Sequence, residues 1–402
     1  MMADAVMKPA ALADVTVLPI ILAVSFSHML NDIMQSMIAA IYPMLKTDYN
    51  LDFWQIGILT LAFQCTASLL QPVVGIITDK KPYPYSLPVG MASTFFGLVL
   101  LATAHDYKML VLAASLVGVG SAIFHPESSR VARLASGGRY GFAQSVFQVG
   151  GNLGTAIGPL LAAFIIVPRG QGSVAWFCIA AILGIIVLSR VARWYKAHML
   201  ANAGKKKLVP AHSLPRNTVV VALVVLVLLT FSKNIYMASI GSYYTFFVIE
   251  RFGVTVQQSQ LMLFVFLGAS ALGTVFGGPI GDRFGSKVVI WISILGVLPF
   301  TLAMPFANLP ATIALSGIVG FIMASSFPAI IVMAQELVPG RVGMIAGVFF
   351  GFAFGMGGIA AAVLGVVADR QGISTVYTIC AFLPALGLLT IFLPSRRKLR
   401  VA

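Results

Sequence analysis

Charged residues are scarce in this sequence. Asp, Glu, Lys and Arg make up 9% of its 402 residues, whereas a soluble domain carries roughly 25%. The chain therefore lacks the polar surface that would cover a soluble core of this size. Cysteine is scarce too. The 3 cysteines, Cys65, Cys178 and Cys380, share no metal-ligand spacing, so we expect neither a disulfide framework nor a metal site.

The sequence is rich instead in long apolar runs. Hydrophobic residues make up 59% of the chain, in stretches of about 20 residues, the length at which a helix crosses the hydrocarbon core of a bilayer. These runs do not alternate as barrel strands do, so they predict an all-α membrane protein of about twelve transmembrane helices. No cleavable signal peptide is expected, because the first run is long and lacks a small-residue cleavage pattern. The expected spans are roughly 15–42, 53–78, 86–104, 109–129, 142–167, 173–193, 218–248, 257–281, 288–306, 309–335, 342–368 and 374–394.

Basic residues gather in every second gap between these runs. The net charge is +14, but no basic stripe with interleaved aromatics accompanies it, so we expect no nucleic-acid partner. If the N-terminus is cytoplasmic, the outer gaps hold Lys46, Lys108, Arg169, Arg251 and Arg370, and almost all other basic residues lie inside. The positive-inside rule then places both termini in the cytoplasm. The expected organisation is a cytoplasmic tail at 1–14, a six-helix bundle at 15–193, a cytoplasmic linker at 194–217, a second six-helix bundle at 218–394 and a cytoplasmic tail at 395–402.

The two bundles repeat one another in sequence. Parallel repeats of six helices are typical of one large transporter architecture, in which the substrate site lies between the halves near the middle of the membrane. The repeat therefore predicts two pseudo-symmetric bundles that move a solute between them. The polar positions that match at an almost constant offset include Asn31 with Asn234, Asp79 with Asp282, and Arg139 with Arg341.

Two short loops carry matching motifs. One reads Gly278-Pro-Ile-Gly-Asp282-Arg283-Phe-Gly285-Ser-Lys287, and the other begins Gly75-Ile-Ile-Thr-Asp79 and then departs at Pro82. Both resemble the G-x-x-x-D-R/K-x-G-x-K/R signature of the major facilitator superfamily. Glycine permits close helix approach, and the aspartate can cap a neighbouring helix end; a tight loop with basic anchors is the alternative. The resemblance implies the major facilitator fold and a gating role, which we extend to Arg130, Arg139 and Arg341.

The span at 142–167 carries a further motif. Gly154-Thr-Ala-Ile-Gly158-Pro159 resembles an element of the drug/proton antiporters of that superfamily, with Ala162 in place of its last glycine; plain helix packing is the alternative. Longer strings resemble bacterial inner-membrane transporters that export the phosphonate antibiotic fosmidomycin, and this resemblance implies proton-driven drug efflux. Among these strings are Ser27-His28-Met-Leu-Asn31-Asp32 and Phe124-His125-Pro126-Glu127-Ser128-Ser129-Arg130.

Ionisable residues inside the expected spans are costly and mark candidate sites. Asp32 lies one helical turn after His28, and Asn31 and Gln35 lie beside it. A carboxyl group next to an imidazole in a partly desolvated cavity is suited to carry a proton. A buried hydrogen-bonded pair that holds the first helix in place is the alternative.

Lys233 is a second candidate, because it lies near the middle of the span at 218–248. The distance to either helix end makes snorkelling strained. Lys233 is therefore expected to bind an anionic substrate, to pair with Asp32, or to exchange between the two. Tyr236 and Tyr243 follow it on nearby faces and are expected to bind substrate.

Further polar residues recur at helical spacing. His125 and Glu127 could form a proton exit or a gate, and a capped helix end is the alternative. Polar stripes on two other spans could line a solute path or hold helices together. The stripe residues expected to contact substrate are Gln64, Gln71, Gln148 and Asn152.

We therefore expect a transporter that exports small anionic or amphiphilic drugs, such as fosmidomycin-like phosphonates, in exchange for protons by alternating access. The proton gradient drives it without a cofactor, its partners are a small molecule, protons and lipid, and it works as a monomer. A proton-coupled symporter that imports an organic anion is the alternative. A membrane-embedded lipid-modifying enzyme is disfavoured, because the sequence shows no Ser/His/Asp order and no H-E-x-x-H motif.

Overall fold

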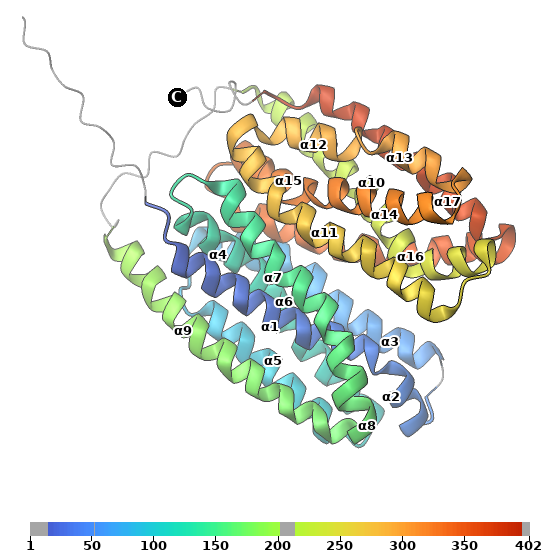
Figure 1. Cartoon of the computed structure of the whole chain (residues 1–402). Coiled ribbons are helices and arrows are strands. Elements are labelled where there is room, and N and C mark those ends of the chain that lie inside the picture. The colour runs from blue at the N-terminus through green and yellow to red at the C-terminus, as the bar shows by residue number, and fades with distance from the viewer. Residues whose placement is uncertain (1–14, 52, 202–213, 396–402) are drawn as a thin grey trace, which may run out of the picture.

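The computed structural model describes residues 15–51, 53–201 and 214–395. Within these ranges every regular element is a helix (Figure 1), as expected of a chain that must satisfy its backbone hydrogen bonds inside a bilayer. The expected tail at 1–14, residues 396–402 of the expected tail at 395–402, and the linker residues 202–213 lie outside the described residues.

The helices form two groups of consecutive elements (Figure 1). The N-terminal half contains α1 (Leu18–Ala40), α2 (Tyr42–Asp48), α3 (Phe53–Gln64), η1 (Cys65–Leu69), α4 (Leu70–Lys80), α5 (Ser86–Thr103), α6 (Tyr107–Ala135), α7 (Tyr140–Leu161), η2 (Ala162–Ile166), α8 (Val167–Arg169), η3 (Gln171–Phe177) and α9 (Cys178–Ala201). The C-terminal half contains α10 (Arg216–Phe252), α11 (Val256–Phe284), α12 (Ser286–Ile294), α13 (Leu298–Ala303), η4 (Met304–Phe306), α14 (Leu309–Ala324), α15 (Ser326–Leu337), α16 (Val342–Gln371), α17 (Ile373–Ala381) and η5 (Leu383–Phe392). Because α9 continues through Ala201, the first residues of the expected linker are helical.

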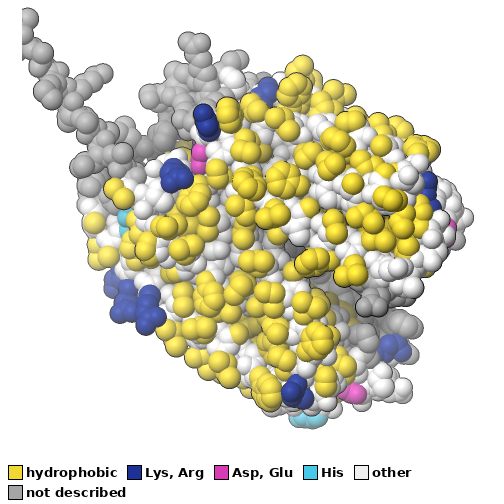
Figure 2. Space-filling view, in the orientation of Figure 1, with side chains coloured by type: hydrophobic (Ala, Val, Ile, Leu, Met, Phe, Trp, Pro, Cys, Tyr) yellow, Lys and Arg dark blue, Asp and Glu magenta, His cyan; other side chains and the backbone are white. Residues whose placement is uncertain are grey.

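Eleven helical segments of the described chain are long and apolar enough to cross a membrane. The remaining expected span coincides with α1, whose mean hydropathy is lowered by its polar residues His28, Asn31, Asp32 and Gln35. The twelve-helix prediction is therefore consistent with the structure. The outward surface in Figure 2 is dominated by hydrophobic side chains, as a lipid-facing belt requires.

Helix ends follow local sequence signals. α6 begins after Asp106, whose carboxylate accepts a hydrogen bond from the Met109 N–H at 2.8 Å. α11 begins after Thr255, which forms a capping box with Gln258. α10 ends at Phe252 and is followed by Gly253, whose φ of 66° is a left-handed conformation that glycine adopts without a steric penalty.

The N-terminal half is built around the contact between α1 and α7. A Cβ at Gly150 would collide with the Ser25 carbonyl oxygen, and one at Gly154 would lie 2.9 Å from Asp32 Cβ. A Cβ at Gly158 would collide with α1 in the same way. Small residues at this spacing let two helices approach closely. The glycines of the antiporter-like motif thus pack α7 directly against the helix that carries Asp32.

Asp79 joins the halves at the end of the molecule where α9 stops and α10 begins, which we call the linker end (Figure 1). Asp79 lies at the end of α4 and accepts hydrogen bonds from the backbone N–H groups of Gly343 and Met344 at 3.0 and 2.8 Å. The carboxylate thus caps the N-terminus of α16 in the other half, where unpaired N–H groups and the helix dipole favour an anion. Gly75 allows this approach, because a Cβ there would collide with the Gly343 carbonyl group.

Asp282 repeats this contact with the halves exchanged. It lies at the end of α11 and accepts hydrogen bonds from the N–H groups of Gly141 and Phe142, both at 2.8 Å. It therefore caps the N-terminus of α7. A Cβ at Gly278 would collide with the Gly141 carbonyl oxygen, so glycine is again required. We call the pair of caps the aspartate lock.

Arg130 reinforces the first cap from α6. Its guanidinium lies 2.6 Å from Asp79 Oδ1 and 3.3 Å from Glu127 Oε1, and it also donates to the backbone carbonyl and the hydroxyl of Thr78. Arg130 is buried, and a buried charge of this kind requires such partners. Each aspartate of the lock therefore caps a helix of the other half. Asp79 has in addition an ion pair with Arg130.

The contacts between the halves end near the middle of the helices. α16 still touches the N-terminal half at Gly351, where a Cβ would lie 2.5 Å from the Ser68 carbonyl oxygen. One turn later, at Gly355, and again at Gly358, no described atom lies within 4 Å of the Cβ position. In Figure 1 the two halves diverge toward the end where α2 and α3 lie. The described helices of the two halves are thus joined at the linker end and diverge toward the opposite end.

Replacing Asp282 with alanine should loosen the linker end, because it leaves the α7 N–H groups without their charged acceptor, a loss of about 1–3 kcal/mol. Ala346 on α16 is fully buried. In a protein whose native cysteines are serine, an Ala346→Cys probe should react with maleimide roughly tenfold faster once Asp282 is replaced. The matched control is Asp106→Ala, which removes a helix cap within one half. Equal labelling rates in the two variants would contradict an inter-half role for Asp282.

Candidate functional site

Three ionisable side chains meet inside the N-terminal half. His28 and Asp32 lie one turn apart on α1, as their spacing predicts, and His125 reaches them from α6. His28 Nε2 lies 3.4 Å from Asp32 Oδ2, and His125 Nε2 lies 3.7 Å from Asp32 Oδ1. The two Nε2 atoms are 3.3 Å apart. All three side chains are buried, so this group, the His–Asp cluster, has little water to stabilise charge.

Backbone carbonyls fix the other nitrogen of each imidazole. His28 Nδ1 lies 2.8 Å from the Phe147 carbonyl oxygen, and His125 Nδ1 lies 3.0 Å from the Ser121 carbonyl oxygen. Because a carbonyl only accepts, each Nδ1 must carry a hydrogen and donate it. In the neutral ring, Nε2 is then a lone-pair acceptor.

This geometry calls for one proton. With both rings neutral and Asp32 ionised, acceptor atoms would face one another at 3.3 to 3.7 Å with no hydrogen between them. A proton on either Nε2 removes the conflict, because that nitrogen then donates to the other ring or to the carboxylate. A second proton would set two Nε2–H groups against each other at 3.3 Å. The contacts therefore favour a single proton held by the three side chains together.

Neutral polar groups orient the carboxylate. Asn31 Nδ2 donates to Asp32 Oδ1 at 3.1 Å, and Gln35 Nε2 donates to the same oxygen at 3.4 Å. The Thr155 hydroxyl on α7 donates to Oδ2 at 3.5 Å. Gln35 is held in turn by the Ser121 hydroxyl at 2.9 Å. The structure thus places Asn31 and Gln35, both predicted from the sequence, at the cluster.

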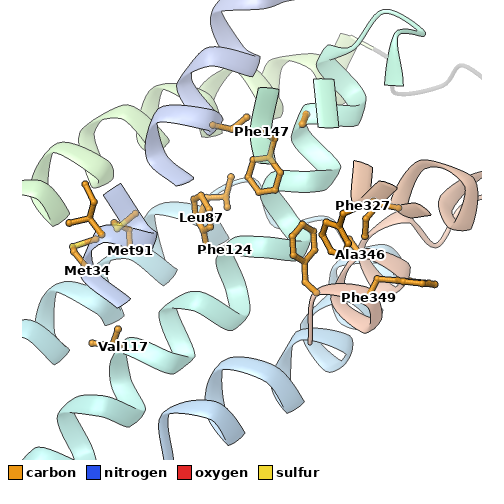
Figure 3. Packing of buried hydrophobic residues seen from close by; sticks show 14 of the residues in the cluster. Met34, Leu87, Met91, Val117, Phe124, Phe147, Phe327, Ala346 and Phe349 are labelled. Atoms are coloured by element: carbon orange, nitrogen blue, oxygen red, sulfur yellow. The ribbon is translucent and has the colours of Figure 1, made fainter. Parts of the chain in front are cut away.

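Aromatic rings cover the cluster. Phe147 stacks on His28 with centroids 4.1 Å apart, and Phe350 of α16, in the other half, packs against His125 at 5.2 Å. Phe350 also meets Phe327 of α15 edge to face at 5.3 Å. Figure 3 shows Phe147 on the N-terminal half and Phe327 on the C-terminal half, both among buried apolar side chains. The C-terminal half therefore contributes a ring cover to a cluster built by the N-terminal half.

The same three side chains are the group most suited to a metal ion in the described part of the chain. Their ligand atoms lie within 4.8 Å of one another, and two imidazoles with a carboxylate suit ions such as Zn²⁺. A shared proton accounts for the same contacts. The expectation that the site holds no metal stays a prediction, and chelation tests it below.

Lys233 lies near the middle of α10 with 8% of its surface exposed. Its Nζ is 4.7 Å from the centroid of the Phe327 ring, a cation–π contact. The four ion pairs among the described residues join Asp32 to His28 and His125, and Arg130 to Asp79 and Glu127, and none includes Lys233. The Asp32–Lys233 pair suggested by the sequence is therefore absent from this conformation, in which Asp32 pairs with the two histidines.

Two predicted substrate-binding residues lie on α7. Asn152 donates to the Thr274 hydroxyl of α11 at 3.1 Å, so it bridges the halves. Gln148 lies one turn earlier, and its Oε1 is buried without a hydrogen-bond partner among the described residues. This unpaired acceptor is consistent with a position beside the solute path.

Two other predicted substrate-binding residues, Gln64 and Gln71, lie on the continuous helix formed by α3, η1 and α4. Gln71 is buried and its Nε2 donates to the Ala67 carbonyl of its own helix at 2.7 Å. Gln64 Oε1 accepts from the Ser68 hydroxyl at 3.4 Å. In this conformation Gln64 Oε1 and Gln71 Nε2 are used in local hydrogen bonds, whereas Gln71 Oε1 is buried without a hydrogen-bond partner among the described residues.

The two tyrosines expected to bind substrate differ in their surroundings. Tyr236 is buried in the core of the C-terminal half, and its hydroxyl donates to Met304 Sδ at 3.8 Å. It faces its own bundle and not the other half, which corrects the expectation. The Tyr243 hydroxyl lies against α16, 2.7 Å from the Cβ position of Gly365. Tyr243 thus packs between two helices of one half.

Glu127 does not join the His–Asp cluster. It follows His125 by two residues and therefore points to another side of α6, where it meets Arg130 at 3.3 Å and the Ser86 hydroxyl at 3.5 Å. His125 and Glu127 thus lie in different groups of contacts, and the expectation that they form a proton exit or a gate stays a prediction. The structure groups Glu127 with the aspartate lock.

The other expected gating residues surround the lock. Arg139 lies over the Phe142 ring at 4.5 Å, and Arg341 lies 3.9 Å from Met344 Sδ. Both therefore lie next to an N–H group that the lock binds. Gly285 ends α11 with a φ of 97°, which explains the glycine in the motif.

The contact between His125 and Asp32 was not predicted from the sequence. Ser121 lies one turn before His125 on α6, and a polar residue at that spacing was a usable signal. The sequence contains no such signal for Phe350, because this residue lies in an apolar run, where a ring that covers a site cannot be told from a ring that packs in the core.

Comparisons with known proteins agree with this architecture. The family model of the Major Facilitator Superfamily matches residues 24–255 and 226–402. The fosmidomycin resistance protein of Escherichia coli (strain K12) is 61% identical over 375 residues, covering 93% of this chain and 92% of that protein. The uncharacterised MFS-type transporter YfnC of Bacillus subtilis (strain 168) is 41% identical over 388 residues, covering 96% and 95%.

Solved structures show the same fold. Two crystal structures of the E. coli fucose:proton symporter FucP, one of them in the outward conformation, align with a TM-score of 0.72 and cover 94% of this chain and 98% of that chain. Their sequence identities are 17% and 18%, so this likeness shows the fold alone. The family match and the relatives together show that the chain is a multi-pass membrane transporter, not an enzyme, and belongs to the Major Facilitator Superfamily.

Proposed function

We propose that the chain is a proton-coupled exporter of small drugs in a bacterial inner membrane, with fosmidomycin as the first candidate substrate. The observation that carries the coupling is the His–Asp cluster, whose buried acceptor atoms call for one shared proton. The choice of fosmidomycin as candidate substrate is supported by the name of the E. coli relative, the fosmidomycin resistance protein. The distribution of basic residues supports a cytoplasmic linker end.

Proton uptake fits the conformation described. The linker end is closed by the aspartate lock, and the halves diverge at the opposite end, which would face the periplasm. Asp32 keeps 7% of its surface exposed. The cluster would therefore take its proton from the periplasmic side, where the gradient supplies it.

A route for proton release is suggested by the contacts of the His–Asp cluster, because its ionisable side chains and its ring cover belong to different halves. His28, Asp32 and His125 all belong to the N-terminal half, so the cluster can stay intact while the halves move. Its Phe350 cover belongs to α16, in the other half. Opening of the linker end would withdraw that ring from His125 and admit cytoplasmic water, into which the proton leaves. Alternation of these two states provides exchange of proton for drug.

Replacing Asp32 with asparagine should abolish coupling. The amide cannot ionise, and its Nδ2–H can donate to a histidine, so the need for a shared proton disappears. In proteoliposomes loaded with a pH indicator, proton movement driven by fosmidomycin should fall at least about tenfold. The matched control is Thr155→Ala, which removes a non-titrating contact to the same carboxylate and should retain coupling.

Two outcomes would contradict this assignment. Undiminished proton movement in Asp32→Asn, with a folded protein by gel filtration, would place the coupling proton elsewhere. Loss of wild-type exchange after treatment with EDTA, restored by Zn²⁺, would show that the three side chains hold a metal and not a proton.

Transport direction separates the exporter from the alternative, a symporter that imports an organic anion. In inside-out vesicles with an acidic interior, an exporter should accumulate radiolabelled fosmidomycin, because it couples the exit of protons from the vesicle to the entry of the drug. In right-side-out vesicles at the physiological gradient, an exporter should lower the internal drug concentration. Accumulation in right-side-out vesicles would instead establish the symporter.

A further inference from the structure

Lys233 is a buried cation that lacks a counterion. Only 8% of its surface is exposed, and neither an ion pair nor a hydrogen bond to its ammonium group is found among the described residues. The guanidinium of Arg130, buried to a similar extent, has Asp79, Glu127 and Thr78 as partners. An unpaired ammonium in a low-dielectric interior is unfavourable, so its retention calls for a partner that this conformation does not supply.

No buried carboxylate of the described chain is available to it. Asp32 is taken by the two histidines, and Glu127 by Arg130. Asp79 and Asp282 cap helices at the linker end. In this conformation the described part of the chain therefore supplies no counterion to Lys233, which leaves that place open to a bound anion.

The position of Lys233 indicates where that counterion binds. The ammonium group lies over Phe327, which contacts Phe350, which in turn packs against His125. Lys233 is thus two rings away from the His–Asp cluster and on the other side of the boundary between the halves. In this fold the substrate site lies between the halves near mid-bilayer. A further unpaired donor, Asn234 Nδ2, lies next to it in the chain.

We propose that Lys233 is the anion-binding group of the translocation pathway and binds the phosphonate or carboxylate head of a small organic anion. A lysine ammonium is a compact point charge, so it accepts a tetrahedral or a planar head group equally. Phe327 offers an apolar surface to the adjacent carbon chain, as rings in small-molecule sites do. This inference rests on the proposed function only in placing the anion in the same pathway as the drug.

Equilibrium binding to the purified protein in detergent tests the site without any gradient. The probes are fosmidomycin and its uncharged dialkyl phosphonate ester. Lys233→Gln should weaken fosmidomycin binding at least about tenfold, the difference expected for one charge-assisted contact, and Lys233→Arg should keep it within about threefold. Ester binding should be the same in wild type and Lys233→Gln. The charge-matched control is Lys108→Gln, in the exposed first turn of α6, which should bind both probes as wild type does.

Thermal unfolding provides a second readout that a structural lysine would not give. Removing an unpaired buried charge relieves its desolvation, so Lys233→Met without ligand should unfold at the same temperature as wild type or higher. A lysine held in a structural ion pair would give a clearly lower unfolding temperature, which would overturn the proposal. Equal fosmidomycin binding by Lys233→Gln and wild type, or equal weakening of both probes, would overturn it as well.

The anion site and proton coupling can fail separately. If fosmidomycin binding depends on Lys233 but Asp32→Asn still moves protons, the anion site stands and the assignment of the coupling proton falls. If Asp32→Asn loses proton movement while Lys233→Gln binds fosmidomycin as wild type does, the coupling stands and the anion site falls.

Discussion

The rest of this structure depends on one constraint: a charge inside the bilayer must find a partner of opposite sign or a proton. The chain meets the constraint in three ways. At the linker end, Asp79 and Asp282 use backbone N–H groups of the opposite half, so that satisfying a carboxylate also closes the interface. In the His–Asp cluster, the contacts favour a proton held between side chains of one half. At Lys233 no partner is found among the described residues, and we propose that a bound anion supplies it. The first solution joins the two halves, and in our proposal the other two bind what is transported.

The internal repeat shows which charges belong to the fold and which to the function. The lock aspartates match each other in the repeat, and each caps a helix of the other half, as a pseudo-two-fold axis requires. At the offset that aligns Asn31 with Asn234, Asp32 faces Ile235 and Lys233 faces Leu30. The ionisable residues of the pathway therefore have no counterpart in the other half. The symmetric charges join the halves, and in our proposal the asymmetric charges give the halves different tasks, because one half binds a proton and the other an anion.

Sequence reasoning reached the helices and the lock because their signals are local. An apolar run long enough to cross a bilayer has few alternatives, and the lock motif contains its own glycine and aspartate. The pairing of Asp32 with His28 was predictable for the same reason, since the two share a helix face. His125 lies on another helix, and only packing decides whether it meets Asp32 or Glu127. Tyr236 was misplaced because helical spacing alone does not show which side of α10 faces its own bundle.

The aromatic rings that cover the His–Asp cluster suggest how binding in one half can affect binding in the other half without a direct ion pair. Phe350 contacts His125 on one side and Phe327 on the other, and Phe327 contacts Lys233. Rings do not neutralise charge, so the proton in the cluster and the ammonium of Lys233 are separated by a layer of low dielectric, across which like charges repel. An anion at Lys233 would remove that repulsion and favour binding of proton and anion together, as in a symporter. Exchange therefore requires that the layer itself change between the two conformations. Because α15 and α16 carry the rings, any movement of the C-terminal half changes the layer itself. Coupling between proton and substrate can therefore arise from electrostatics across a movable apolar layer, without contact between the two sites.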